Sequence, residues 1–236
     1  MNTEIIVERL FEVLIRGDRA AARKLVAETK EAGVTAEELS HEVYWAVLEM
    51  LNTLYRADQL TTMAHHYATR LLRRLVDQAQ AAYTQRPKRD RKVLMFCGRA
   101  DADELEAQLV ADLAEADGYD VYFGGAGIAN DEILAEVGVQ RPDLLLFFAS
   151  APSDAPNIRQ LIDKIRGIGA RPEMQIVVGG GVFNRAEGLA EEIGADLWAK
   201  DPRELLKKLV TMKDRRATAD QRTVGRNRRG NKSAVA

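Results

Sequence analysis

Acidic side chains follow a short apolar segment in the middle of the chain, and they are the first candidates for chemistry. Residues 93–96 are apolar and stop at Cys97-Gly98, after which the sequence reads RADADELE and begins an amphipathic helix pattern at about Asp103. This order predicts a strand, a loop and a helix. In an open parallel sheet, the loops at the carboxyl ends of the strands form the ligand crevice, so residues 99–103 are expected to line the site.

A pair of adjacent histidines is the second candidate. His65 and His66 lie near the start of a helix pattern, and adjacent helical residues point about 100° apart, so at most one of them faces the rest of the protein. We expect this to be His66, because Met63 and Tyr67 would give it apolar neighbours. The pair is also typical of a helix surface, and it leaves haem, bilin or metal binding open. We assign no metal ligand from it.

Four amphipathic helices are predicted ahead of the acidic loop, in a domain covering residues 1–84. Apolar residues recur at helical spacing in four stretches, near residues 3–15, 19–32, 35–54 and 62–83. Thr35 followed by Glu38 has the spacing of a capping box. Short loops between four such helices predict a four-helix bundle, and the charged, proline-broken residues 85–91 form a linker.

Short apolar runs alternate with helix patterns over residues 92–212. We expect strands near residues 93–96, 120–123, 144–148, 176–178 and 196–199, and helices near residues 103–116, 130–137, 156–166, 185–193 and 202–210. This alternation predicts an α/β domain with a flavodoxin-like, doubly wound, five-stranded parallel sheet, for which we expect the strand order 2-1-3-4-5. The switch point then lies between the first and third strands, beside residues 99–103 and 150–154.

Composition places the chain among ordinary globular proteins. With 236 residues, 46% hydrophobic and 30% charged, it is long enough to bury one or two cores. No apolar run approaches the roughly 18 residues of a membrane helix, and the first residues lack a signal-peptide cleavage site, so we expect a cytoplasmic protein. The single cysteine, Cys97, excludes an internal disulfide and a multi-cysteine metal cluster.

Basic residues are concentrated after Met212. Eight basic residues face two acidic ones there, a net charge of +6 in a chain whose total is −2. Because the segment has few apolar residues, residues 213–236 are predicted to be a disordered basic tail. Such a tail attracts an acidic partner or nucleic acid, the latter through phosphate contacts of Arg226, Arg228 and Arg229, or it only keeps the protein soluble.

Two longer motifs follow the acidic loop, GYDVYFGG at residues 118–125 and VVGGGVFNRAEGLAEEIGADLWAKDPRELL at residues 177–206. Together with a helical bundle ahead of a flavodoxin-like sheet, they resemble the cobalamin-binding module of methionine synthases, corrinoid carrier proteins and light-sensing cobalamin regulators. In that family the loop after the first strand carries Asp-x-His-x-x-Gly, whose His is the lower ligand of cobalt. The matching positions here are Asp101, Asp103 and Glu106.

The resemblance implies an altered site, because the Asp is kept while the His and the Gly are replaced. A carboxylate is a harder ligand for cobalt than imidazole, so we expect cobalamin ligated by a protein histidine to be lost. Glu106 stands where the family's glycine lets the nucleotide tail of the cofactor pass. Two further groups of residues match the family. Ser150, Gly179 and Gly180 lie where the family builds the slot for the nucleotide tail. Tyr55, His65 and His66 lie where the regulators cover the upper face of the corrin. The two glycines are explained equally well as residues that only allow a tight turn between a strand and a helix.

Two other sites are weaker predictions. Asp101 and Asp103, with Lys200, resemble the magnesium site of a phosphoacceptor receiver domain, but the third strand ends in Phe148-Ala149-Ser150 and supplies no aspartate to phosphorylate. The glycine runs lack the G-x-G-x-x-G spacing of a dinucleotide site. No hydrolytic or redox motif is present.

We therefore expect a module without catalysis of its own, a sensor, regulator or scaffold that holds another tetrapyrrole or no ligand. The alternative is a corrinoid carrier for methyl transfer that binds cobalamin without a lower ligand from the protein. Self-association through the two domains is a further expectation from the related regulators, although no residue specifies a symmetry.

Overall fold

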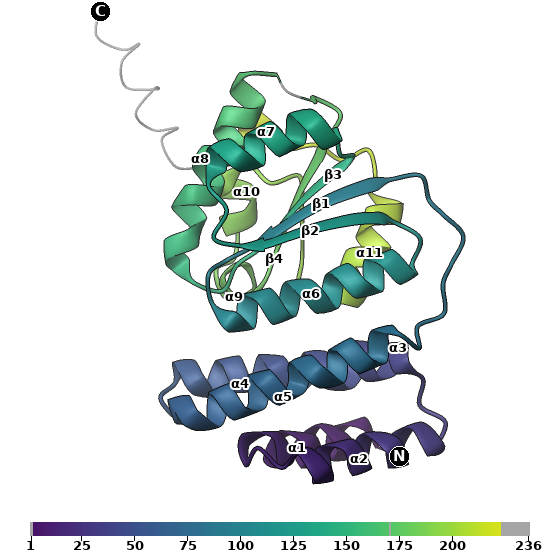
Figure 1. Ribbon diagram of the computed structural model, residues 1–236. Helices are drawn as coiled ribbons and strands as arrows, with labels where there is room; N and C mark the ends of the chain where they lie inside the picture. Colours follow the sequence, from purple (N-terminus) through teal and green to yellow (C-terminus); the bar gives the residue numbers. More distant parts are fainter. Residues whose placement is uncertain (1, 170, 223–236) are drawn as a thin grey trace, which may run out of the picture.

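The first third of the chain forms the helical bundle (Figure 1). The computed structural model describes residues 2–169 and 171–222. The bundle consists of α1 (Thr3–Ile15), α2 (Arg19–Glu31), α3 (Ala36–Glu38), the π-helix η1 (Leu39–Tyr44), α4 (Trp45–Arg56) and α5 (Thr62–Gln80). Because α3, η1 and α4 follow one another without a break, residues 36–56 act as one long helix with a π-helical middle. Its start is the expected capping box, in which Thr35 and Glu38 each accept the other's backbone N–H.

The remainder is built on five parallel strands. These are β1 (Lys92–Cys97), β2 (Asp120–Ala126), β3 (Leu144–Phe148), β4 (Gln175–Gly179) and β5 (Leu197–Ala199). Their order, β2-β1-β3-β4-β5, is the predicted one, and every neighbouring pair is parallel. The sheet is therefore the expected doubly wound α/β sheet with its switch point between β1 and β3.

Helices cover both faces of the sheet (Figure 1). One face carries α6 (Asp101–Ala116) and α11 (Pro202–Thr211), and the other carries α7 (Asn130–Gln140), α8 (Ala155–Gly167) and α10 (Leu189–Ile193). Alternate strand residues feed two separate cores, as the two-residue period of a strand requires. The predicted helix at 185–193 is in fact two short ones, α9 (Gly181–Arg185) and α10, because Gly188 adopts a left-handed conformation between them. Short 3₁₀ turns, η2 (Pro152–Asp154) and η3 (Ala219–Gln221), complete the described elements.

Helix α6 joins the two domains. Helices α4 and α5 pack against it from the bundle side, and the sheet packs against it from the other (Figure 1). The hydrophobic core of the bundle is consequently continuous with the core under one face of the sheet. Leu105 and Leu109 of α6 are completely buried in this shared core.

The segments at the two ends of the sheet domain are bound to it. In the expected linker, Arg86 and Arg89 both form ion pairs with Asp117, at the end of α6, at 2.6 and 2.8 Å. Arg215 and Arg222, in the part we predicted to be disordered, donate hydrogen bonds to the backbone carbonyls of Asp196, just before β5, and of Ile193, at the end of α10. The prediction of disorder thus fails for residues 213–222, and the rest of the tail, 223–236, lies outside the described residues.

Among the helices that the structure describes, none is both long enough and apolar enough to cross a membrane.

Shortening one α6 side chain should destabilise the whole molecule. Leu109→Ala leaves a cavity in the core that the bundle and the sheet share, and we expect it to lower the free energy of unfolding by about 3 kcal/mol. Denaturant unfolding followed by circular dichroism measures this. Val139→Ala, on α7 at 74% exposure, is the matched control and should change stability little. Equal stabilities of the two variants would contradict the shared core.

Candidate functional site

Two buried carboxyl groups mark the start of α6. Asp103 has no exposed surface, and neither of its carboxylate oxygens has a hydrogen-bond partner of normal geometry within residues 2–169 and 171–222. Burial raises the pKa of Asp103, and contacts with Ser150 offset only part of this effect. Gly98 makes room for the group, because a Cβ atom there would collide with Oδ2 of Asp103 and would lie 2.7 Å from Oδ2 of Asp154.

Glu106, one turn further along α6, connects the two domains. It is 3% exposed, and its Oε1 accepts a 2.7 Å hydrogen bond from the Nδ2 of Asn52 on α4. Its other oxygen has no partner in the described part of the chain. Burial, and next the nearby Asp103, raise the pKa of Glu106 to about 8, although the Asn52 hydrogen bond acts in the opposite direction. Glu106 is therefore mainly protonated at pH 7.

The carboxyl ends of β3 and β4 form the floor beside these groups. Gly180 has a φ of 95°, and a Cβ atom there would lie 2.5 Å from the carbonyl oxygen of Ala149. A Cβ atom on Gly179 would lie 2.7 Å from the ring of Phe148. The fold's own packing therefore requires both glycines, as the turn interpretation predicts. The predicted Ser150 lies at the same edge, where its carbonyl accepts a 2.6 Å hydrogen bond from Nη2 of Arg185.

The predicted residues of the bundle meet each other at the end of α4 and the start of α5. The rings of Tyr55 and His65 stack with their centroids 4.1 Å apart, and His66 is tilted beside them at 6.2 Å. Burial, and then the charge of His66, lower the pKa of His65. The carboxylate of Asp101 opposes this shift, which places the first residue of α6 near the histidine.

Our choice of His66 as the inward histidine is wrong. His65 is 7% exposed, whereas Met63 and Tyr67, the apolar neighbours expected for His66, are 61% and 48% exposed. The helix is rotated so that His65, not His66, packs against Tyr55. The predicted site residues thus form two groups: a floor on α6 and the sheet edge, and an aromatic pair on the bundle.

A cleft of about 490 Å³ opens between the domains beside Glu106. It is lined by α4 on the bundle side and by α9 on the sheet side. Three of its polar residues, Asn52, Arg56 and Arg185, were absent from the sequence prediction. Asn52 carried a local signal, because it interrupts the apolar stripe of α4 that Leu48 and Leu51 define. The two arginines carried none.

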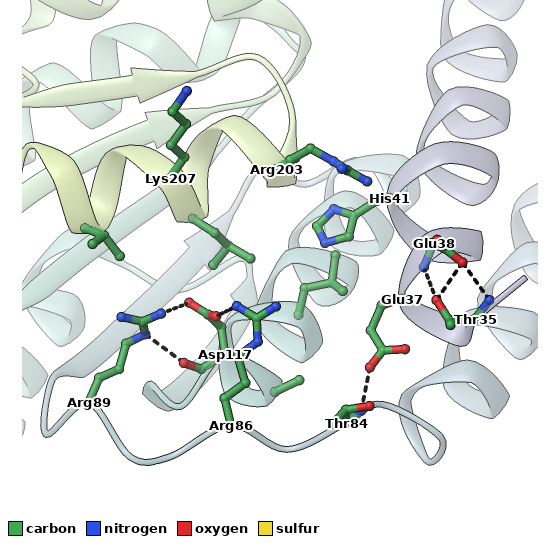
Figure 2. A pocket seen from close by; sticks show the side chains of 14 residues that line it. Thr35, Glu37, Glu38, His41, Thr84, Arg86, Arg89, Asp117, Arg203 and Lys207 are labelled. Carbon is green, nitrogen blue, oxygen red and sulfur yellow. Dashed lines mark hydrogen bonds and ion pairs between the residues drawn. The ribbon is translucent and has the colours of Figure 1, made fainter.

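Two other hollows are poorer candidates. One, of about 640 Å³, lies at the opposite end of α6, and Figure 2 shows Arg86 and Arg89 directed at Asp117 there. Its Arg203 also has an ion-pair partner, Glu42. The other, at the switch point between β1 and β3, holds only about 80 Å³ and cannot admit a dinucleotide, since ligand pockets usually have at least about 300 Å³. Within residues 2–169 and 171–222, no three His, Cys, Asp or Glu side chains are grouped to hold a metal ion.

Comparison with known proteins gives a consistent result. Two family models, both described as a B12 binding domain, match residues 6–80 and 91–207, which are the bundle and the sheet domain. Monomethylamine corrinoid proteins 2 and 1 of Methanosarcina mazei are 20% and 19% identical to the chain, over 87% and 88% of it and 96% and 97% of their own lengths. The structure of the Methanosarcina barkeri monomethylamine corrinoid protein superposes with a TM-score of 0.69 at 18% identity, over 89% of this chain and all of that one. This last likeness shows the shared two-domain fold.

Replacing the buried acid by its amide tests the ionisation of the site. Because the pKa of Glu106 is higher in the folded than in the unfolded chain, its burial costs nothing below about pH 4 and increasingly destabilises the protein as the pH rises towards 8. Glu106→Gln keeps the acceptor for Asn52 and should stabilise the protein by about 3 kcal/mol at neutral pH.

Thermal unfolding between about pH 5 and pH 8 measures the effect. The advantage of Glu106→Gln over the natural protein should grow with pH over this range. Glu104→Gln, a half-buried position on the same helix, is the control. A constant difference between Glu106→Gln and the natural protein at every pH would contradict a neutral Glu106.

Proposed function

We propose, from the premise that this chain belongs to the family of two-domain B12-binding modules, that it is a corrinoid carrier. In this function the protein holds a corrinoid and presents it to partner proteins that exchange its methyl group. One observation carries the proposal: the relatives that match both domains over nearly their whole lengths are named as corrinoid proteins. This favours the carrier over the sensor that we preferred from the sequence.

The cleft between α4 and the sheet edge supports this function, because it lies between the two domains and is lined by residues of both. It opens between the two matched domains, beside the position where the family has its cobalt ligand. The rings of Tyr55 and His65 stack at the end of α4 and the start of α5, where Tyr55 keeps a partly exposed aromatic surface while His65 is buried. A planar ring system packs favourably against such a surface.

The residues present do not fit a cobalamin held from below by a protein imidazole. Position 103 carries a buried carboxyl group, and the imidazoles of His65 and His66 belong to the bundle. Threading the nucleotide tail into the sheet is blocked as well, because Glu106 is bonded to Asn52 and the ring of Phe148 covers Gly179. We therefore propose that the corrinoid is bound in the cleft with its own base still on the cobalt.

A second candidate function is a scaffold that holds no corrinoid. It is favoured by the cross-domain hydrogen bond from Asn52 to Glu106 and by the bond from Arg185 to Ser150, which together close the floor where a cofactor tail would enter. The scaffold would act through the contact between the bundle and α6. Another tetrapyrrole, held between the bundle residues Tyr55 and His66 and the sheet, belongs to the same candidate, because it too needs no opening in the floor.

Corrinoid binding and its ligation distinguish these candidates. Equilibrium dialysis against cyanocobalamin, haemin and biliverdin, read by visible absorption, should give binding of cyanocobalamin alone. In the reduced Co(II) form, the nitrogen coupling in the electron paramagnetic resonance spectrum should come from the cofactor's own base. It should be unaffected by labelling the protein's histidines with ¹⁵N.

The double variant Asp103→His with Glu106→Gly restores the family's residues and should bring the ¹⁵N-histidine coupling into the spectrum. Glu104→His, which places an imidazole on a half-buried position of the same helix, is the control and should not. A preparation that binds no corrinoid would contradict the carrier and favour the scaffold. Histidine coupling in the natural protein would contradict the base-on mode.

A further inference from the structure

Two arginines from different domains meet at the interdomain cleft. Arg56 ends α4 on the bundle side, and Arg185 ends α9 on the sheet side. Burial, and next the positive charge of Arg56, lower the pKa of Arg185, so the two guanidinium groups are close enough to repel each other. Their hydrogen bonds go to neutral oxygens, of Thr53 and Ser150, and neither has an ion-pair partner in the part of the chain that the structure describes.

The acids beside the arginines offset this effect only in part: Glu106 and Asp103 raise the pKa of Arg185, but burial and Arg56 outweigh them. Glu106 lies in the same cleft, but burial holds it mainly in the protonated form at pH 7. Burial also raises the pKa of Asp103 behind it and of Glu49 on the cleft wall. The cleft therefore combines two unpaired cations with a buried carboxyl group whose second oxygen has no partner among residues 2–169 and 171–222. This arrangement attracts an anion that the two sides hold jointly.

We propose that Arg56 and Arg185 form an anion-binding site between the two domains, and that its ligand is a phosphate ester. The planar guanidinium fork binds phosphate oxygens in pairs, and two forks from opposite walls suit a tetrahedral group better than a flat carboxylate. The phosphate has two possible sources, a free phosphate compound or the phosphodiester in the nucleotide loop of a corrinoid. The second source rests on the proposed function. In that case the nucleotide loop of the corrinoid would lie on the surface of the cleft and not in a slot in the sheet.

Glu106 makes this site dependent on pH. The charged and titratable groups that face it are Glu49 and Arg56 of α4, Asp103 of α6 and Arg185 of α9. Below about pH 8 the neutral Glu106 leaves the two arginines free for the anion. Above that pH it ionises, and its charge competes with the ligand. Affinity for the anion should therefore fall as the pH rises through 8, and Glu106→Gln should remove this dependence.

The test uses the full chain and three probes. Inorganic phosphate, followed through the arginine side-chain NMR signals, reports the anion site alone. Cyanocobalamin carries the phosphodiester, and cobinamide is the same corrin without the nucleotide loop. Arg56→Gln and Arg185→Gln should each weaken phosphate and cyanocobalamin about tenfold and leave cobinamide unchanged. Arg23→Gln, exposed on α2 away from the cleft, is the matched control and should change nothing.

Each outcome has one meaning. Phosphate binding that depends on both arginines, without any corrinoid binding, would keep the anion site and remove the corrinoid carrier. An equal loss of cobinamide and cyanocobalamin would overturn the assignment of a phosphate ester, because the arginines would then contact the corrin itself. Natural protein that binds neither phosphate nor cyanocobalamin at about pH 6, or arginine variants that bind both as the natural protein does, would overturn the site.

Discussion

Helix α6 is covered by the sheet on one side and by the bundle on the other, and this double burial controls the chemistry of the protein. A helix that packs on one layer can turn its acidic residues towards water. Here Asp103 and Glu106 have almost no exposed surface, and burial raises the pKa of both. Asp112, further along, is affected in the same way, with a pKa raised to about 7 by burial. The domain interface thus decides which carboxyl groups carry charge.

The same packing separates the part of the interface that holds the domains together from the part that is open to a ligand. Along its middle, α6 contributes leucines to a core that the bundle and the sheet share, and loss of water from this apolar surface favours the docked arrangement. Hydrogen bonds such as the one from Asn52 to Glu106 fix the orientation of α4 on α6 but contribute little to the net free energy of folding. The cleft with Arg56 and Arg185 lies at the margin of this core, where the two domains diverge. Ligand binding there requires no opening of the apolar interface.

How much could be predicted from the sequence follows from the range of the interactions. Capping at Thr35 and the strand order depend on local patterns and general rules of connection, and both predictions are confirmed. The inward histidine was wrong because the rotation of α5 is set by its contact with Tyr55, which helix periodicity does not reveal. The contact of Glu106 with Asn52 joins residues 54 positions apart. Residues 213–222 were missed because Arg215 and Arg222 bind backbone carbonyls, which leave no apolar signal.

The substitutions on α6 form a physical unit. Position 103 carries a buried carboxyl group and offers no imidazole, and Glu106, one turn further along, is buried and tied to the bundle by Asn52. Asp103 contributes to the raised pKa of Glu106, because a negative charge at position 103 disfavours a second one close by, and Glu106 is therefore accommodated mainly in its protonated form. Gly98 gives Asp103 room. The floor of the site is thereby closed around a mainly protonated Glu106, and at its rim Arg56 and Arg185 carry positive charges that have no ion-pair partner among the described residues.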